Sequence, residues 1–127
     1  MIVVAAALVR DGRVLVAQRT RPPELSGRWE LPGGRVEAGE SEPDALAREC
    51  REELGAQVRA TGRVGADLPL PAGVLRVHLA ELLPGSPEPA ALEHAALRWV
   101  AVPEFAALDW VDADRAVLED LAAALRG

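Results

Sequence analysis

The segment spanning residues 34–56 places the strongest constraint on what this chain can fold into, because it predicts a helix with two unlike sides. Glu49, Glu52 and Glu53 stand three and four residues apart, which brings three carboxylates to one side of a helix over about residues 43–54. The apolar residues of the same segment recur at i, i+4 and i+8: Leu46, Cys50 and Leu54. This stripe predicts that the helix docks on a core.

Local signals set the ends of this helix. Ser41 followed by Asp44 is the pattern of a capping box, and Pro43 falls in the first turn, where its missing N–H costs nothing. Gly55 predicts the C-terminal stop. Before the helix, the Pro-Gly-Gly turn at residues 32–34 lets backbone carbonyls approach a ligand closely. A loop and a helix therefore converge on one point, with acid on the exposed side.

The three carboxylates are open to two interpretations. One is an ordinary solvated acidic face; the other is a cation site, because like charges at this spacing destabilise an isolated helix by a few tenths of a kcal/mol per pair. The docked helix and the glycine turn favour the cation site. Oxygen ligands clustered without Cys or His favour magnesium or manganese over zinc or copper.

Composition limits the class of protein. A chain of 127 residues that is 50% hydrophobic fits one domain with a real core. No apolar run reaches the ~18 residues that span a membrane, and the apolar start lacks a basic segment before it, so we expect a buried strand there. The one cysteine, Cys50, excludes an internal disulfide and is compatible with a reducing cytoplasm, where we expect the protein to act.

Charge limits the partners. The net charge of −6 argues against binding long nucleic acids through a basic face. Seven acidic residues fall between Glu37 and Glu53, so an anionic substrate can bind there only if metal ions reverse the local sign.

Hydrophobic periodicity predicts a mixed sheet with a helix on each face, an α/β fold. Strands are expected at residues 2–10, 13–19, 29–31, 57–66, 74–82 and 97–100, with a hairpin turn at Asp11-Gly12. Loops are expected at 20–28, 67–73 and 84–96, a helical turn at 103–108, and one final helix at 113–125.

Over residues 34–56 the chain resembles the Nudix hydrolase family. Every fixed position of the family signature, the Nudix box at residues 34–56, is filled: Gly34, Glu40, Arg48, Glu49, Cys50, Glu52, Glu53, Gly55 and Ala56. We call this segment the box. Cys50 and Ala56 are smaller than the usual Leu, Ile or Val. The segment from Trp29 to Ser41 is also similar to MutT-like nucleotide hydrolases. The resemblance implies a single Nudix domain over residues 1–127, an α/β/α sandwich with a mixed β-sheet between helices.

The resemblance also implies roles for the box residues. Mg²⁺, with Mn²⁺ as a possible substitute, would be held by Glu49, Glu52, Glu53 and the backbone carbonyl near Gly33. Arg48 would orient the carboxylates and Glu40 would fix the loop, with Gly34 and Gly55 completing the structure of the box. The catalytic residues would be Glu49, Glu52 and Glu93, with either Glu49 or Glu93 as the general base; the alternative for Glu93 is a solvated loop residue.

Substrate contacts are implied at five positions: Arg19, Glu30, Leu31, Arg35 and Asp114. The basic pair would lie near the phosphates and Asp114 would read the base edge, while Asp112 is expected to cap the last helix. An ionised Asp only accepts hydrogen bonds, which suits the N–H donors of a guanine-type base or of cytosine. His78 and His94 have no metal-ligand spacing, and we interpret both as structural.

The implied activity is hydrolysis of a nucleoside triphosphate to a monophosphate and pyrophosphate. The expected substrates are 8-oxo-dGTP or cytidine-type triphosphates, which makes the function nucleotide-pool sanitation and links it to DNA repair. The alternative enzyme is an ADP-ribose or nucleoside-diphosphate-sugar hydrolase, for which Pro71 stands at a suitable distance after the box. A non-catalytic nucleotide-sensing module is disfavoured because every box glutamate is present. Monomer and homodimer both remain open.

Overall fold

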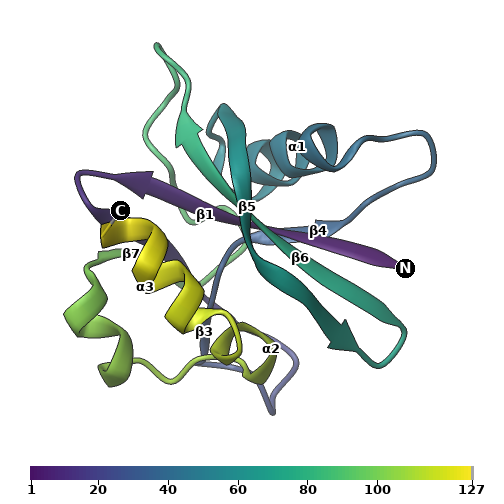
Figure 1. Ribbon diagram of the computed structural model, residues 1–127. Coiled ribbons are helices and arrows are strands. Elements are labelled where there is room, and N and C mark those ends of the chain that lie inside the picture. The colour runs from purple at the N-terminus through teal and green to yellow at the C-terminus, as the bar shows by residue number, and fades with distance from the viewer. Residues whose placement is uncertain (127) are drawn as a thin grey trace.

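A computed structural model describes residues 1–126 (Figure 1). The elements in chain order are β1 (Ile2–Arg10), β2 (Arg13–Gln18), β3 (Trp29–Glu30), β4 (Gly33–Arg35), α1 (Glu42–Leu54), β5 (Val58–Leu70), β6 (Gly73–Leu82), β7 (Ala96–Val100), the 3-10 helix η1 (Val102–Ala107), α2 (Asp112–Arg115) and α3 (Leu118–Arg126).

The sheet is organised around β1. This strand pairs in parallel with β6 and antiparallel with both β4 and β2. The β5 strand lies antiparallel to β6 on one side, and β2 carries β3 and β7 on the other. Asp11 and Gly12 both have positive φ, as the tight turn between β1 and β2 requires. The sheet is therefore mixed, as predicted.

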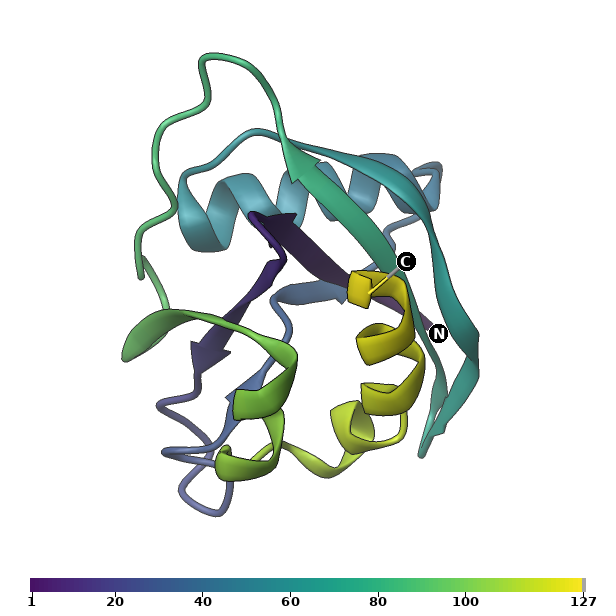
Figure 2. The same ribbon diagram turned by 60° about the vertical axis from the view of Figure 1, so that its left-hand side comes forward.

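Alternate residues of β1 face two separate cores. Val4, Ala6 and Leu8 pack with the buried residues of α1, whereas Ala5 and Ala7 pack in the cluster that contains buried residues of α3. A strand buried on both faces needs a continuous apolar sequence, which explains the run at the start of the chain. Helices α1 and α3 lie on opposite faces of the sheet (Figure 2), which confirms the expected α/β sandwich.

The ends of α1 follow the local signals. The Ser41 hydroxyl accepts a hydrogen bond from the backbone N–H of Asp44 at 3.2 Å, and the helix begins at Glu42. Gly55 has a φ of 65°, and its N–H bonds to the carbonyl of Arg51 at 3.0 Å. The apolar stripe is fully buried, so the carboxylate side of α1 has a fixed direction.

The expected loop at residues 67–73 is wrong in its first part. β5 continues to Leu70, and only two residues separate it from β6. Register shifts between Ala60 and Gly62 and between Val64 and Leu68 absorb the irregular sequence. Leu68 and Leu70 pack against the core, so burial outweighs the turn propensity of the neighbouring prolines.

The single final helix is also wrong, because α2 and α3 are separate. The break lies at residues 116–117, where Val117 is buried. The expected cap is wrong as well: Val111 is the residue before α2, and no side chain caps that end. Asp112 instead has an 89% exposed side chain that lies 3.5 Å from Arg28.

Candidate active site

Two glycines bring the Pro-Gly-Gly turn into close contact with its neighbours. A Cβ on Gly33 would overlap the carbonyl oxygen of Val4 in β1, and a Cβ on Gly34 would overlap the carboxylate of Glu49 in α1. Any larger residue would therefore separate β4 from β1 or displace Glu49. Gly33 and Gly34 belong to strand β4 rather than to the expected turn, but this segment and the acidic side of α1 meet as the sequence predicts.

Arg48 connects the turn and the helix through five hydrogen bonds. Its Nε and Nη2 donate to the two carboxylate oxygens of Glu40 at 2.7 and 3.0 Å, and its Nη1 donates to Glu49 at 3.0 Å and Glu52 at 3.3 Å. Nη2 also donates to the carbonyl of Arg35 at 2.9 Å. The guanidinium, with help from a backbone N–H, lowers the pKa of Glu40 to about 2. Arg48 therefore sets the direction of these carboxylates.

Glu53 is a buried carboxylate with an unsatisfied oxygen. The residue is 7% exposed, and its Oε2 has no hydrogen-bond partner among residues 1–126. Burial, followed by the charges of Glu49, Glu30 and Glu93, raises the pKa of Glu53 to about 8, against the opposing N–H of Gly33. A divalent ion would satisfy this oxygen and neutralise the surrounding charge, so the donor set fits magnesium.

The other two box glutamates differ in their surroundings. The pKa of Glu49 is raised by burial and by the charges of Glu52 and Glu93, although the hydrogen bond and charge of Arg48 oppose this rise. Glu52 has a 53% exposed side chain. Within residues 1–126, no three acidic, His or Cys side chains already converge as a coordination group. Glu49 and Glu52 share their oxygens with Arg48 instead.

A small polar cavity of about 100 Å³ lies beside Glu53. Its lining comes from segments far apart in the sequence: Arg19, Thr20, Arg21, Glu30, Glu53, Glu93 and His94. The loop before β7 is tied to the end of α1, because Ala90 donates to the carbonyl of Leu54 at 2.9 Å and Leu92 to that of Glu53 at 3.2 Å. These bonds place Glu93 next to the box.

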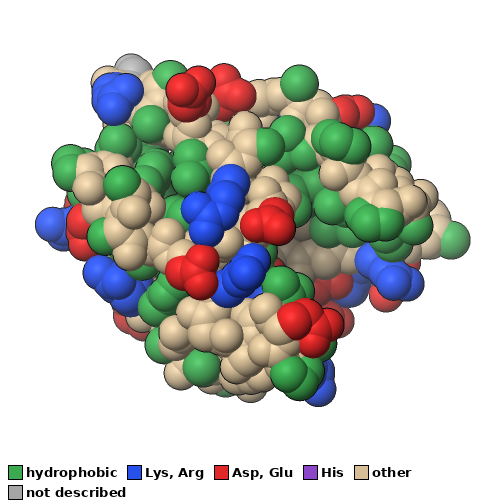
Figure 3. All heavy atoms as spheres, turned by 90° about the horizontal axis from the view of Figure 1, so that it is seen from below, with side chains coloured by type: hydrophobic (Ala, Val, Ile, Leu, Met, Phe, Trp, Pro, Cys, Tyr) green, Lys and Arg blue, Asp and Glu red, His purple; other side chains and the backbone are tan. Residues whose placement is uncertain are grey.

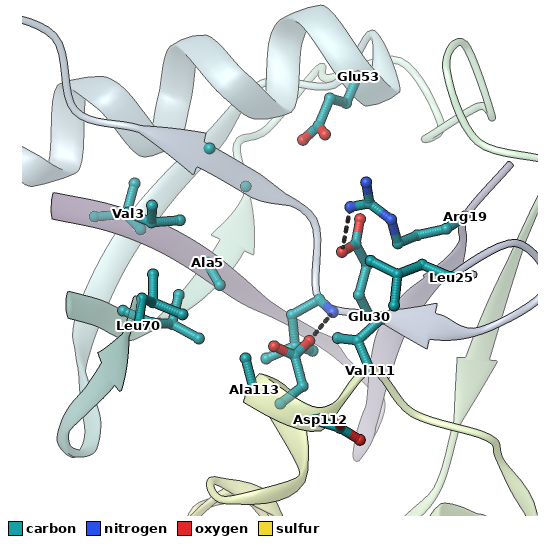
Figure 4. A pocket seen from close by; sticks show the side chains of 16 residues that line it. Val3, Ala5, Arg19, Leu25, Glu30, Glu53, Leu70, Val111, Asp112 and Ala113 are labelled. Atoms are coloured by element: carbon teal, nitrogen blue, oxygen red, sulfur yellow. Dashed lines mark hydrogen bonds and ion pairs between the residues drawn. The ribbon is translucent and has the colours of Figure 1, made fainter. Parts of the chain in front are cut away.

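A larger cavity of about 440 Å³ adjoins it and has mainly aliphatic walls. Glu53 points from α1 toward this cavity, beside the paired Arg19 and Glu30 (Figure 4). The walls are formed by Val3, Ala5, Leu25, Leu70, Val111 and Ala113. The surface in Figure 3 is hollowed, with acidic and basic side chains around the hollow. The cavity therefore offers an apolar interior with charge at one end.

Asp114 is the polar group in this apolar interior. It is 5% exposed, and its Oδ2 accepts a hydrogen bond from the backbone N–H of Leu31 at 2.7 Å. Burial raises the pKa of Asp114 to about 7, although the N–H of Leu31 opposes this rise.

The structure brings most of the implied substrate contacts together. Arg19, Glu30, Leu31 and Asp114 all line the larger cavity, whereas Arg35 is exposed at the end of β4 and lines neither cavity. Its backbone carbonyl accepts a hydrogen bond from Arg48, and a role of its side chain near the phosphates stays a prediction.

His94 is the site residue that the sequence analysis missed. Its Nε2 lies 2.9 Å from Oε2 of Glu30, and the residue lines the small cavity. Its position next to Glu93 was the one available signal. His78, in contrast, bonds to Glu42 at the opposite end of α1, where a structural role fits.

Glu53 and Asp114 predict how the stability of the metal-free protein depends on pH. Their pKa values rise from 4.5 to about 8 and from 3.8 to about 7, so the folded state holds protons that the unfolded state releases. The stabilising contribution of these two groups to the free energy of unfolding is complete below about pH 4 and is lost as the pH rises to about 8. The urea midpoint in the presence of a chelator should therefore fall between about pH 5.5 and 8.5. A midpoint that rises over this interval would contradict the two assignments.

Comparisons with known proteins agree with this site. The family model described as NUDIX domain matches residues 1–121. The chain is 56% identical over 130 residues to the Mycobacterium tuberculosis (strain H37Rv) protein named "Putative 8-oxo-dGTP diphosphatase 2", covering 99% of this chain and 91% of that protein. It is 36% identical over 118 residues to the CTP pyrophosphohydrolase of Escherichia coli K12, covering 92% and 87% of the two chains.

A solved structure shows the same fold. The MutT NUDIX hydrolase from Burkholderia pseudomallei superimposes with a TM-score of 0.76 at 34% identity, covering 94% of this chain and 95% of that one. Over residues 1–126, no helix is long and apolar enough to cross a membrane. Fold, box and relatives agree: the chain belongs to the Nudix family and is a Nudix pyrophosphohydrolase.

Proposed function

We propose that the protein hydrolyses nucleoside triphosphates to a monophosphate and pyrophosphate with the help of magnesium, and that 8-oxo-dGTP or cytidine-type triphosphates are its substrates. The observation that carries this proposal is the pair of adjoining cavities. One has mainly aliphatic walls, holds the buried carboxylate of Asp114 in its apolar part and suits a base. The other is polar, lies beside the box and suits the phosphates. The names of the two relatives support the choice of base.

The metal would be held by Glu49, Glu52 and Glu53, with the backbone carbonyl near Gly33; manganese would serve as a substitute. The unsatisfied oxygen of Glu53 supports this assignment. When bound, the ion supplies charge neutralisation at the phosphates and a more acidic water.

The protein's own residues would bind the phosphates and move a proton. Arg19 lines both cavities, so its guanidinium can contact the phosphates where base and phosphate chain meet. A carboxylate oxygen of Glu93, or of Glu49, would accept a proton from the attacking water. The water oxygen bonds to phosphorus while the bond to the leaving pyrophosphate breaks, which conserves atoms and charge.

Asp114 would select the base. The N–H of Leu31 occupies Oδ2, which leaves Oδ1 to accept from the base edge. When the carboxylate is ionised, its acceptor oxygens suit the N1–H and N2–H of a guanine-type base or the N4 amine of cytosine.

We expect Asp114→Ala to reduce discrimination among nucleobases by about tenfold or more, because a lost hydrogen bond affects preferred and rejected bases unequally. Competition between triphosphates measures this ratio, and calorimetry with manganese should show unchanged metal affinity. Asp120→Ala is the matched control, since Asp120 is exposed on α3, lines neither cavity and should leave the ratio unchanged. A loss of metal affinity in Asp114→Ala would show that Asp114 acts elsewhere.

A substrate panel tests the proposed reaction. Natural and oxidised triphosphates, ADP-ribose and nucleotide sugars are each incubated with magnesium, and pyrophosphate and monophosphate release are followed. Fastest pyrophosphate release from 8-oxo-dGTP or a cytidine triphosphate is expected. Preferential cleavage of ADP-ribose or a nucleotide sugar would establish the alternative enzyme, and binding without turnover would establish a sensing module.

Location and assembly also belong to the proposal. We place the protein in the cytoplasm, acting on free nucleotides rather than on long nucleic acids, as a monomer or homodimer. Its single cysteine is buried in α1, with its thiol pKa raised by burial to about 12, which suits a packing role rather than disulfide chemistry.

A further inference from the structure

His94 joins the loop before β7 to β3 through a buried contact. Its side chain is 7% exposed, and its Nε2 lies 2.9 Å from Oε2 of Glu30, whose side chain is 15% exposed. The other oxygen of Glu30, Oε1, accepts from Nη1 of Arg19 at 2.9 Å. The three side chains therefore form a continuous row, His94–Glu30–Arg19, from three separate segments of the chain.

The hydrogen-bonding pattern assigns each group a role. A carboxylate oxygen only accepts, so Nε2 of His94 carries the proton in this contact. In the neutral ring Nδ1 is then an acceptor, and it is buried without a hydrogen-bond partner among residues 1–126. An unsatisfied buried nitrogen costs free energy. The ring is therefore held in this position by its one hydrogen bond, the bond to Glu30.

Arg19 is the end of the row that reaches the cavities. Glu30 accepts from Nη1, and the carbonyl of Arg21 accepts from Nε at 3.0 Å, so two contacts fix the guanidinium plane. Neither contact uses Nη2. The Arg19–Glu30 pair is seen beside Glu53 in Figure 4.

We propose that His94 is a positioning residue that acts through Glu30 to aim the guanidinium of Arg19 at the substrate phosphates. This inference rests on the proposed role of Arg19 in phosphate binding. Without His94, Glu30 can rotate while still paired with Arg19, and the guanidinium loses its fixed direction. The loop itself stays anchored, because backbone bonds of Ala90, Leu92 and Ala95 hold it to α1 and β2. Replacing His94 should therefore change the direction of the Arg19 guanidinium and leave Glu93 in place.

The kinetic test uses His94→Leu, which keeps bulk and removes the donor. We expect KM for the preferred triphosphate to rise about tenfold with kcat changed less than about threefold, because a contact made in both ground and transition states is weakened. His94→Gln restores a donor at similar reach and should recover KM to within about threefold of the unchanged protein. In a Glu30→Ala background, His94→Leu should raise KM by less than about a further twofold.

His78 provides the matched control, because it makes an equivalent contact away from the cavities. Its side chain is 10% exposed, and its Nε2 lies 2.9 Å from Glu42. His78→Leu should leave KM and kcat unchanged while it lowers the thermal midpoint to a similar degree as His94→Leu. Equal rises in KM in the two variants, or a rise in KM that adds fully in the Glu30→Ala background, would overturn the inference.

A measurement without substrate separates this inference from the proposed function. Nitrogen NMR of the unliganded protein should show His94 as the Nε2–H tautomer, with a slowly exchanging proton that exchanges rapidly in Glu30→Ala. An Nδ1–H tautomer, or exchange unaffected by Glu30→Ala, would overturn the inference. Lack of triphosphate turnover by the unchanged protein would instead contradict the proposed function.

Discussion

Replacing Glu53 by Gln is expected to lower kcat/KM for triphosphate hydrolysis by about 10³-fold or more, and at the same time to stabilise the metal-free protein. The amide keeps the shape of the side chain but removes the charge that would hold the ion. The carboxylate is buried with an unsatisfied oxygen, and its pKa is raised to about 8, so its ionisation opposes folding. We expect the free energy of unfolding of the variant to be higher by on the order of 2 kcal/mol at about pH 8, measured by urea unfolding with a chelator.

The matched control for this prediction is Glu119→Gln. Glu119 is exposed on α3, so the same chemical change should leave activity and stability unaffected. An active Glu53→Gln protein would remove Glu53 from the mechanism. A large loss of stability in that variant would show that the carboxylate is satisfied in solution.

Replacing Arg48 by Lys is expected to lower kcat/KM by about 30- to 100-fold although the charge is retained. The ammonium group has no planar fork, so it cannot reach both oxygens of Glu40 together with Glu49 and Glu52. The carboxylates lose their common direction and the turn separates from α1. Steady-state kinetics should show this loss together with a thermal midpoint roughly 5 °C lower.

Arg51→Lys is the control on the same helix. Arg51 is exposed, and we expect its replacement to change neither kcat/KM nor the thermal midpoint. If Arg48→Lys behaved like Arg51→Lys, charge alone would explain the role of Arg48, and the fork geometry would be irrelevant.

The parts of the fold predicted from sequence are those that local chemistry determines. The cap at Ser41, the stop at Gly55 and the apolar stripe between them all act within α1, so its bounds were predicted to within one residue. The continuous apolar run of β1 predicted a buried strand, and the structure shows that it is buried on both faces.

The errors arise where distant contacts override local preference. The end of β5 has loop-forming prolines, yet pairing with β6 keeps Leu70 in the sheet. The break between α2 and α3 has no Gly or Pro to signal it. Asp114 lies before that break, and its carboxylate bonds to the N–H of Leu31, 83 residues earlier. Periodicity within one segment contains no information about such a partner.

The candidate site also divides into residues that local spacing predicts and residues that depend on distant contacts. The box has fixed spacing on one helix, so its glutamates and Arg48 could be named from sequence. His94 meets Glu30 across 64 residues, and no spacing rule predicts that contact. Arg35 is expected near the phosphates only from the resemblance to MutT-like enzymes, and in the structure it is exposed at the end of β4 and lines neither cavity.

The central claim is that the carboxylates of α1 hold the divalent ions that make the phosphate chain reactive. It is tested most directly by a crystal soaked with manganese and a non-hydrolysable triphosphate, with data collected at the manganese absorption edge. We predict anomalous peaks roughly 2.0–2.3 Å from carboxylate oxygens of Glu52 or Glu53, with the phosphates beside them. Ordered nucleotide without a peak near Glu49, Glu52 or Glu53, in a crystal form that still hydrolyses triphosphate, would contradict the claim.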